Sequence, residues 1–408
     1  MALLGSFPVV RRPSTPRILA PIPLARRNLL ADRRRLLRAL AGIAFAVLLM
    51  MVELGFRTAF IGSMLLPIQQ LDGDLMLLSS TKYEFDRKAP FPRRLFYEAG
   101  AVPGIASVRP LYLERRTAVW KNPQTLELFG IQVFGFDPDQ PVFLLPEVAA
   151  RLDALRQPDT VMIDRRARSN MGYASAGLRT ELSRRNIQVV GTFRLGPNFF
   201  SDGTVIMSDR NFFKFFGNFS SSPTDLPDIT DLPDIEVGVI KVSPGRRIPD
   251  VQRVLQAALP ASVTVLTKAQ LIDQERRFHL QVSPVGPIFD VGTLVGFAVG
   301  MLICYQILFS ELSDQLSQYA TLKAMGYYNS YLVKVVLEQA VLYALLAYIV
   351  AWVGCYVIFR VVGELALIPL QMSVGLTVTS VALALTMCIG AALIAVRRVL
   401  ATDPAELF

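Results

Sequence analysis

Three long runs of uncharged, mostly apolar residues limit what this chain can fold into. They cover residues 291–309, 341–359 and 376–396. Each approaches the length of about twenty residues that a helix needs to cross the hydrocarbon core of a bilayer. The chain as a whole is 52% hydrophobic and only 18% charged, a composition that disfavours an ordinary soluble protein. The sequence therefore predicts membrane-spanning helices.

A fourth apolar run, residues 39–52, is shorter than the other three. By itself it fits a signal-peptide core or a buried helix as well as a span. However, Leu36 and Leu37 lengthen it, and no small-residue cleavage site follows. We therefore expect a first span that continues as a helical stalk outside the membrane. Glu53 and Arg57 stand four residues apart in this stalk, the spacing at which opposite charges pair on a helix.

Arginines predict the orientation of the four spans. They crowd residues 11–38, which hold a single aspartate, and Arg397 and Arg398 follow the last span. Because positively charged flanks stay in the cytoplasm, both termini are expected there, with the long segment after the first span outside. Much of the net charge of +9 comes from this cluster of arginines. Binding to the anionic lipids of the inner leaflet explains a basic cluster beside a membrane span. Membrane lipid, and no nucleic acid, is therefore the expected partner.

The expected organisation alternates membrane helices with soluble segments in the plasma (inner) membrane. The chain is predicted to begin with a cytoplasmic lead and an interfacial helix at 1–35, followed by a first transmembrane helix with its stalk at 36–64. An exterior α+β domain follows at 65–285, with an insertion at about 137–234. The remaining parts are a second transmembrane helix at 286–310, a cytoplasmic helix at 311–328, a third transmembrane helix at 329–360, a short exterior loop at 361–370, a fourth transmembrane helix at 371–396 and a cytoplasmic tail at 397–408.

The exterior segment contains two β-α-β patterns on either side of the insertion. The strand patterns lie at 73–80, 105–120, 236–242 and 263–267, and the helix patterns at 92–100 and 249–259. Two such units predict a split, ferredoxin-like α+β domain. Asn122-Pro123 also predicts a tight turn between two strands.

The sequence lacks the patterns of an enzyme. No lysine follows a glycine, so there is no phosphate-binding P-loop. The single histidine, His279, cannot supply a histidine-based metal cluster or a Ser-His-Asp triad. The cysteines, Cys304, Cys355 and Cys388, lie inside apolar runs and are expected to pack as small apolar residues. We therefore expect no catalytic residue, metal site or cofactor on this chain.

Glycines recur at every fourth position in the second span. Gly292, Gly296 and Gly300 form a doubled GxxxG pattern, which leaves a smooth strip where another helix can approach closely in lipid. Two readings stay open: contact between two copies of the chain in a dimer, and packing against another span of the same chain.

A short amphipathic stretch separates the second and third spans. Leu312, Leu316, Tyr319 and Lys323 recur at helical spacing, and Gly326 follows as a helix-ending glycine. The apolar face must be buried, either on the inner leaflet or in a groove of a soluble partner.

The same stretch carries a resemblance to a known family. The segment "ATLKAMGYYNSYLVKVVLEQAVL" and the ending "RRVLATDPAELF" resemble the FtsX/MacB-type ABC transporter permeases. The segments "AVWKNPQT", "GFDPDQPVFLLPEV" and "DGTVIMSDRNFFKFF" resemble the DevC subfamily within it, the permeases of the cyanobacterial heterocyst glycolipid exporter.

This resemblance implies a polytopic α-helical membrane protein with four transmembrane helices and a large periplasmic α+β domain, made of a MacB-like porter and an inserted subdomain. It implies a homodimeric exporter subunit that works with a separate ABC ATPase, which binds ATP and Mg, and with a periplasmic membrane-fusion adaptor and a TolC-like outer-membrane channel. The coupling helix seated on the ATPase would comprise Ser313, Leu316, Tyr319, Ala320, Leu322, Lys323, Met325 and Gly326. The alternatives are an FtsX-like signalling subunit that controls a periplasmic cell-wall hydrolase, and a lipoprotein-releasing permease.

Overall fold

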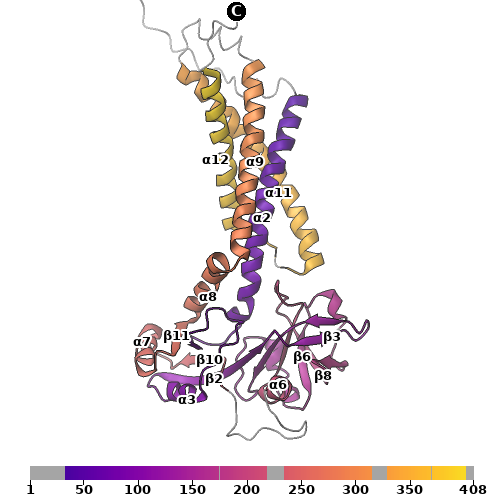
Figure 1. The fold of residues 1–408 in the computed structure, drawn as a ribbon, viewed down its shortest axis with the longest axis vertical. Helices are drawn as coiled ribbons and strands as arrows, with labels where there is room; N and C mark the ends of the chain where they lie inside the picture. Colours follow the sequence, from indigo (N-terminus) through magenta and orange to yellow (C-terminus); the bar gives the residue numbers. More distant parts are fainter. Residues whose placement is uncertain (1–32, 174, 218–233, 315–328, 369, 401–408) are drawn as a thin grey trace, which may run out of the picture. The chain divides into compact units, whose positions relative to one another are not determined.

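The computed structural model describes residues 33–173, 175–217, 234–314, 329–368 and 370–400 (Figure 1). Its four long helices are α2 (Arg33–Gln69), α9 (Val285–Asp314), α11 (Asn329–Ala366) and α12 (Val374–Leu400). Their segments Leu36–Gln69, Val285–Asp314, Val333–Leu365 and Val374–Arg398 are long and apolar enough to cross a membrane. A large α+β region, the sheet domain (residues 70–282), lies between α2 and α9 in the chain. The expected combination of four apolar helices with an α+β domain is confirmed.

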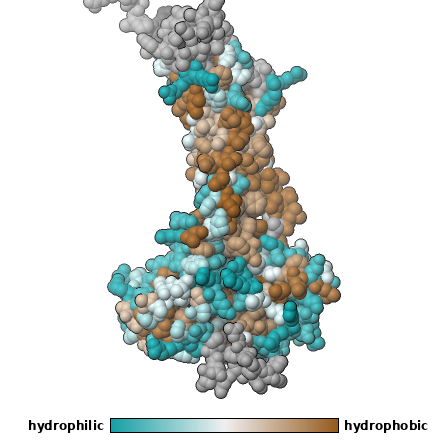
Figure 2. Space-filling view, viewed as in Figure 1, coloured by the Kyte–Doolittle hydropathy of each residue, from teal (hydrophilic) through white to brown (hydrophobic). Residues whose placement is uncertain are grey.

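The chain divides into two compact units, and each contains part of the long helices. The first comprises Met1–Phe45, Val299–Tyr348 and Ala382–Phe408, and the second Ala46–Ala298 and Ile349–Val381. On the face that Figure 2 shows, hydrophobic residues cover much of the long helices and hydrophilic residues cover much of the sheet domain. This division of surface is what a chain with both lipid-facing and water-facing parts requires.

One mixed sheet of eleven strands runs through the sheet domain, in the order β11-β1-β10-β2-β5-β9-β6-β8-β7-β3-β4. The strands are β1 (Leu75–Ser79), β2 (Ile105–Glu114), β3 (Val119–Lys121), β4 (Leu128–Gly130), β5 (Gln132–Phe136), β6 (Thr160–Asp164), β7 (Arg179–Leu182), β8 (Arg185–Phe193), β9 (Thr204–Ser208), β10 (Val237–Val242) and β11 (Val263–Thr267).

The predicted ferredoxin-like half is confirmed. β11, β1, β10 and β2 are neighbours and all pair antiparallel. The helix α3 (Arg93–Gly100) connects β1 to β2, and α7 (Ile248–Ala258) connects β10 to β11. The two β-α-β units therefore interleave in one sheet, as the split pattern requires.

The predicted insertion extends this sheet instead of forming one of its own. β5 pairs antiparallel with β2 and parallel with β9, and the sheet continues from there to β4. β3, β4 and β5 precede residue 137, yet β3 pairs with β7 at the far end. The chain thus leaves the ferredoxin-like half directly after β2. The predicted turn between β3 and β4 is confirmed: the Asn122 Oδ1 accepts the amides of Gln124 and Thr125 at 2.7 and 3.1 Å.

Alternating apolar residues bury both faces of the sheet. In β1, Leu75 and Leu77 join a core that includes residues of α3, α7 and α6 (Asp209–Phe216). Met76 and Leu78 point into a second core, which includes residues of α8 (Lys268–Arg277) and of the α2 end. Because each fully buried Leu or Met side chain contributes roughly 1.5–3 kcal/mol, the burial of both faces contributes strongly to the stability of the central strands.

Two short helices complete the second core. α4 (Pro146–Ala149) and α5 (Leu152–Leu155) each bury one residue, Val148 and Leu155, against it. The 3₁₀ turn η1 (Ser169–Met171) lies on the other core, where its Met171 carbonyl accepts a hydrogen bond from the buried Trp120 indole at 3.0 Å.

Candidate functional site

The segment predicted as a coupling helix lies almost entirely outside the described residues. α9 ends at Asp314 and α11 begins at Asn329. Ser313 is described, as a half-buried residue in the last turn of α9. The other predicted coupling residues fall outside the described ranges: Leu316, Tyr319, Ala320, Leu322, Lys323, Met325 and Gly326. Their role stays a prediction.

A buried hydrogen bond joins the helices on either side of that segment. The Tyr343 hydroxyl of α11 donates to the Glu311 carboxylate of α9 at 3.1 Å, and both side chains are buried. Gln339, one helical turn before Tyr343, is also buried, and its Nε2 has no partner among the described atoms. A hydrogen bond to a buried carboxylate is stronger than one between neutral groups, so it ties α9 and α11 together. Sequence reasoning missed Glu311 because it lies just beyond the uncharged run.

Two thiols meet between α9 and α12. The sulfur atoms of Cys304 and Cys388 lie 3.4 Å apart, both residues are buried, and the three cysteines are free thiols. Near the end of α12, the Arg398 guanidinium donates to the Tyr305 hydroxyl of α9 at 3.1 Å. The cysteines therefore pack as expected for small buried residues, with one specific contact that the sequence does not reveal.

The glycine strip of α9 lies against α2 of the same chain along part of its length. A methyl group at Gly292 would lie 2.9 Å from the Glu53 carboxyl carbon, and one at Gly296 would lie 3.1 Å from Met50. Gly300, the third glycine of the strip, is buried in α9. Small residues at these positions let the backbones approach closely, so at Gly292 and Gly296 the strip serves packing within the chain. A dimer contact stays a prediction.

The predicted ion pair between Glu53 and Arg57 needs correction. In the described part of the chain, the Arg57 guanidinium pairs with Asp290 of α9 at 3.3 Å, and no ion pair joins it to Glu53. Glu53 turns instead toward Gly292. The i, i+4 rule describes an isolated helix, whereas here a second helix offers Arg57 a carboxylate on its other side.

Charged side chains of the segment after β1 are buried against residues at β10 and β5. The Lys82 ammonium lies 3.1 Å from Glu236, with side chains 1% and 6% exposed. Burial lowers the pKa of Lys82, and the Glu236 charge opposes this effect. Asp86 accepts a hydrogen bond from Gln132 at 2.6 Å, and burial raises the pKa of Asp86 to about 6. Such pairs either fix a structure or serve a function.

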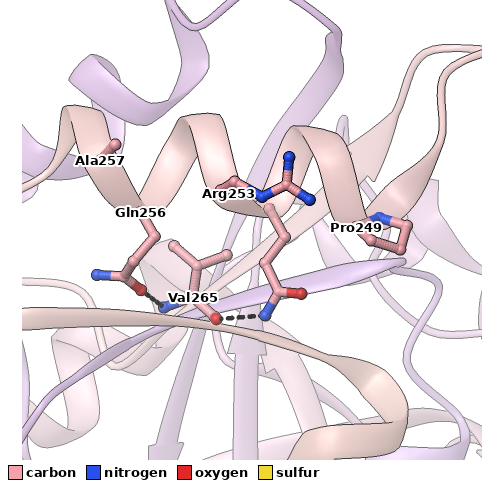
Figure 3. A pocket seen from close by; sticks show the side chains of 6 residues that line it. Pro249, Arg253, Gln256, Ala257 and Val265 are labelled. Carbon is pink, nitrogen blue, oxygen red and sulfur yellow. Dashed lines mark hydrogen bonds between the residues drawn. The ribbon is translucent and has the colours of Figure 1, made fainter.

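A depression on the described part of the sheet domain is lined by α7 and β11. Figure 3 shows this depression along α7, where Gln256 and Gln252 hydrogen-bond the Val265 backbone of β11 at 2.7 and 2.9 Å. Their amide groups are thus occupied in joining helix to strand. Among the residues that the structure describes, no group of three His, Cys, Asp or Glu side chains is arranged to hold a metal ion.

The last three long helices match a known family. Residues 291–404 match the family model described as FtsX-like permease C-terminal. This range begins in α9 and includes α11 and α12. Residues 291–404 are therefore similar to an FtsX-like permease C-terminal domain, in a chain with four helices that are able to cross a membrane. The family part of the resemblance found in the sequence is confirmed over this range, and the DevC part stays a prediction.

Two solved structures resemble part of the chain. The periplasmic region of MacB from Actinobacillus actinomycetemcomitans matches with 11% identity and a TM-score of 0.34, covering 50% of this chain and 92% of its own. The extracellular domain of the noncanonic ABC-type transporter YknZ from Gram-positive bacteria matches with 12% identity and a TM-score of 0.31, covering 48% and 99%. Similarities this distant do not support a conclusion about function. No curated protein matches the sequence.

Proposed function

We propose that this chain is the permease subunit of a MacB/DevC-type ABC exporter. In this proposal, two copies form the membrane part, and a separate ATPase supplies the energy. The sheet domain lies in the periplasm, where it delivers cargo, glycolipid in the DevC case, to an adaptor and an outer-membrane channel. The observation that carries the proposal is the FtsX-like permease domain at residues 291–404, in a chain whose first two long helices flank a large α+β domain.

The arrangement of contacts suits a subunit that transmits motion. α9 and α11 flank the predicted coupling segment, and the Glu311–Tyr343 hydrogen bond ties them together. A push on that segment would therefore move both helices as a pair. Charges are costly in the middle of a bilayer, and the ion pair of Arg57 with Asp290 lies at the start of α9, on the side that follows the sheet domain in the chain.

The FtsX-like signalling alternative shares the permease domain and differs in its partners. Purifying the chain from its native membrane and identifying every co-purifying protein separates the two. An ATPase together with a membrane-fusion adaptor supports export. An ATPase with a cell-wall hydrolase, and no adaptor, turns the function into signalling. Recovery of no ATPase overturns both.

The coupling helix is tested by the double variant L316D/K323E. Placing an acidic group on the apolar face and reversing the charge beside it should abolish seating on the ATPase, because the apolar face can no longer be buried. We expect transport-linked ATP hydrolysis to be lost while membrane insertion is unchanged. A variant with wild-type coupling contradicts the assignment of this helix.

A further inference from the structure

The short connection between α8 and α9, called the joint below, has an unusual backbone conformation. α8 ends at Arg277 and passes into η3 (Phe278–Val282), a π-helical turn, before Ser283 adopts an extended conformation. The backbone at Gly286 then packs closely against the backbone at Leu280, because a methyl group at Gly286 would lie 2.4 Å from the Leu280 carbonyl oxygen. π-helical turns are rare and often mark functional positions. This one stands where the sheet domain passes into a membrane-length helix.

The only histidine of the chain is buried in this joint. His279 is 2% exposed, and its Nε2 lies 3.0 Å from Glu275 Oε1 on α8. The other carboxylate oxygen of Glu275 accepts the Phe85 amide at 2.8 Å. Glu275 therefore connects the histidine to the segment that follows β1. The His279 Nδ1 is buried and has no partner among the described atoms.

The imidazole also contacts α2. The Phe60 ring meets it edge to face, with centroids 5.4 Å apart, and Phe60 is itself 2% exposed. Phe60 further contacts Phe289 in the first turns of α9 at 6.2 Å. The histidine thus contacts α8 through Glu275 and α2 through Phe60, and Glu275 in turn holds the segment after β1 through the Phe85 amide.

We propose that His279 is a positioning residue that locks the sheet domain to α2 at this joint, through its hydrogen bond to Glu275 and its edge contact with Phe60. This role rests on the proposed function, in which motion of the membrane helices must reach the sheet domain without being lost in a loose connection. A joint held at two points moves with α2 and α9 together. A joint without the histidine leaves Glu275 Oε1 without this hydrogen bond and Phe60 packed against a gap.

Two substitutions separate the two contacts. H279F keeps an aromatic edge for Phe60 and removes the hydrogen bond. H279Q removes the ring and keeps an amide that donates to Glu275. Q256A serves as the control, because Gln256 hydrogen-bonds backbone groups of β11 on the sheet domain and has no part in the joint.

Hydrogen exchange of the full chain in lipid nanodiscs measures the lock directly. In H279F, peptides spanning residues 81–89 should exchange about tenfold faster, as expected when a hydrogen bond to a charged group is lost, and H279Q should restore protection. Q256A should leave these peptides unchanged. Wild-type exchange of residues 81–89 in H279F overturns the proposal, because Glu275 would then hold Phe85 without help from the histidine.

The transmission step is measured on the complex purified with its ATPase. ATP with vanadate should change exchange at residues 278–286 in the wild type and in Q256A, and should not do so in H279F. A wild-type response in H279F overturns the positioning role. A wild-type complex that shows no response at all overturns the proposed function, while the nanodisc result on the lock still stands.

Discussion

Gly55 of α2 lies directly against the ring of Phe359 in α11. A methyl group at Gly55 would lie 2.0 Å from Phe359 Cζ and within 2.9 Å of two further ring atoms, and the Phe359 side chain is 3% exposed. A buried ring in a packed interface has little room to move aside. This glycine therefore sets how closely α2 and α11 approach each other.

The variant G55A should destabilise the packing of α2 on α11. Overpacking a tight interface costs about 1–3 kcal/mol, so the thermal midpoint of the chain in detergent should fall. G62A is the matched control, because Gly62 lies in the same helix and has no atom within 4 Å of an added methyl group. That change should be neutral or stabilising by up to about 1 kcal/mol. Equal effects of the two variants would contradict the close approach at Gly55.

Breaking the buried pair of Lys82 and Glu236 should destabilise the sheet domain strongly. K82M leaves the Glu236 carboxylate buried with the Ala89 amide, at 3.1 Å, as its remaining hydrogen-bond donor. Removal of one partner of a buried pair costs about 3–5 kcal/mol. Denaturant unfolding should show this loss, and K82M/E236Q should recover part of it because the unpaired charge is gone.

An exposed ion pair provides the control for that experiment. Arg253 and Asp250 pair at 3.5 Å on α7 with side chains 77% and 53% exposed. R253A should change stability by less than about 1 kcal/mol, as is usual for exposed pairs. If R253A costs as much as K82M, burial is not the reason for the effect.

Asp86 should make the sheet domain less stable as the pH rises. Burial raises the pKa of Asp86 from 3.8 to about 6 in the folded chain, so folding favours its protonated form. The resulting stabilisation is present below about pH 4 and is lost as the pH rises through about 6. The loss amounts to at most about 3 kcal/mol, at about 1.4 kcal/mol for each pKa unit.

The variant D86N checks this pH dependence. Its Oδ1 still accepts the Gln132 hydrogen bond, and it does not titrate. The stability of D86N relative to the wild type should therefore increase between pH 4 and pH 7, as measured by denaturant unfolding at several pH values. A stability difference that stays constant over this range would show that Asp86 does not titrate there.

Cys304 and Cys388 should cross-link on oxidation. Their sulfur atoms already lie 3.4 Å apart, so a membrane-permeant oxidant such as copper-phenanthroline should join α9 to α12 within one chain. Peptide mass spectrometry identifies the product. C388A should abolish the cross-link, while C355A should leave it unchanged, because Cys355 is on α11 and has no part in this contact. A cross-link that survives in C388A would contradict the pairing.

Several features followed from local patterns in the sequence. The apolar runs predicted four long helices because a bilayer requires that length of apolar residues. Short apolar runs at β1 and β10 and the apolar spacing of α7 predicted the ferredoxin-like half, because two β-α-β patterns in one domain are typical of that fold. The turn at Asn122 was predictable for the same kind of reason, because its side chain bonds backbone groups two and three residues ahead.

Contacts between distant segments were not predictable in this way. Arg57 has Glu53 at ideal helical spacing but pairs with Asp290, which only the packing of α9 on α2 brings near. The insertion was predicted as a part of the exterior domain, yet its joining to the ferredoxin-like half in one sheet depends on β5 pairing with both β2 and β9. His279 was recognised only as a lone histidine, and its hydrogen bond to Glu275 and its burial against Phe60 depend on how α8 packs on α2.

The sequence by itself thus determined where the long apolar helices lie, which segments can enter a membrane, and the main strands of the ferredoxin-like half. These properties depend on residues close together in the chain. Only the tertiary structure decided which glycines approach which helix, which carboxylate each arginine and lysine meets, and where the lone histidine lies. Those outcomes are set by the close packing of elements far apart in sequence, and no local pattern encodes which partner packing will supply.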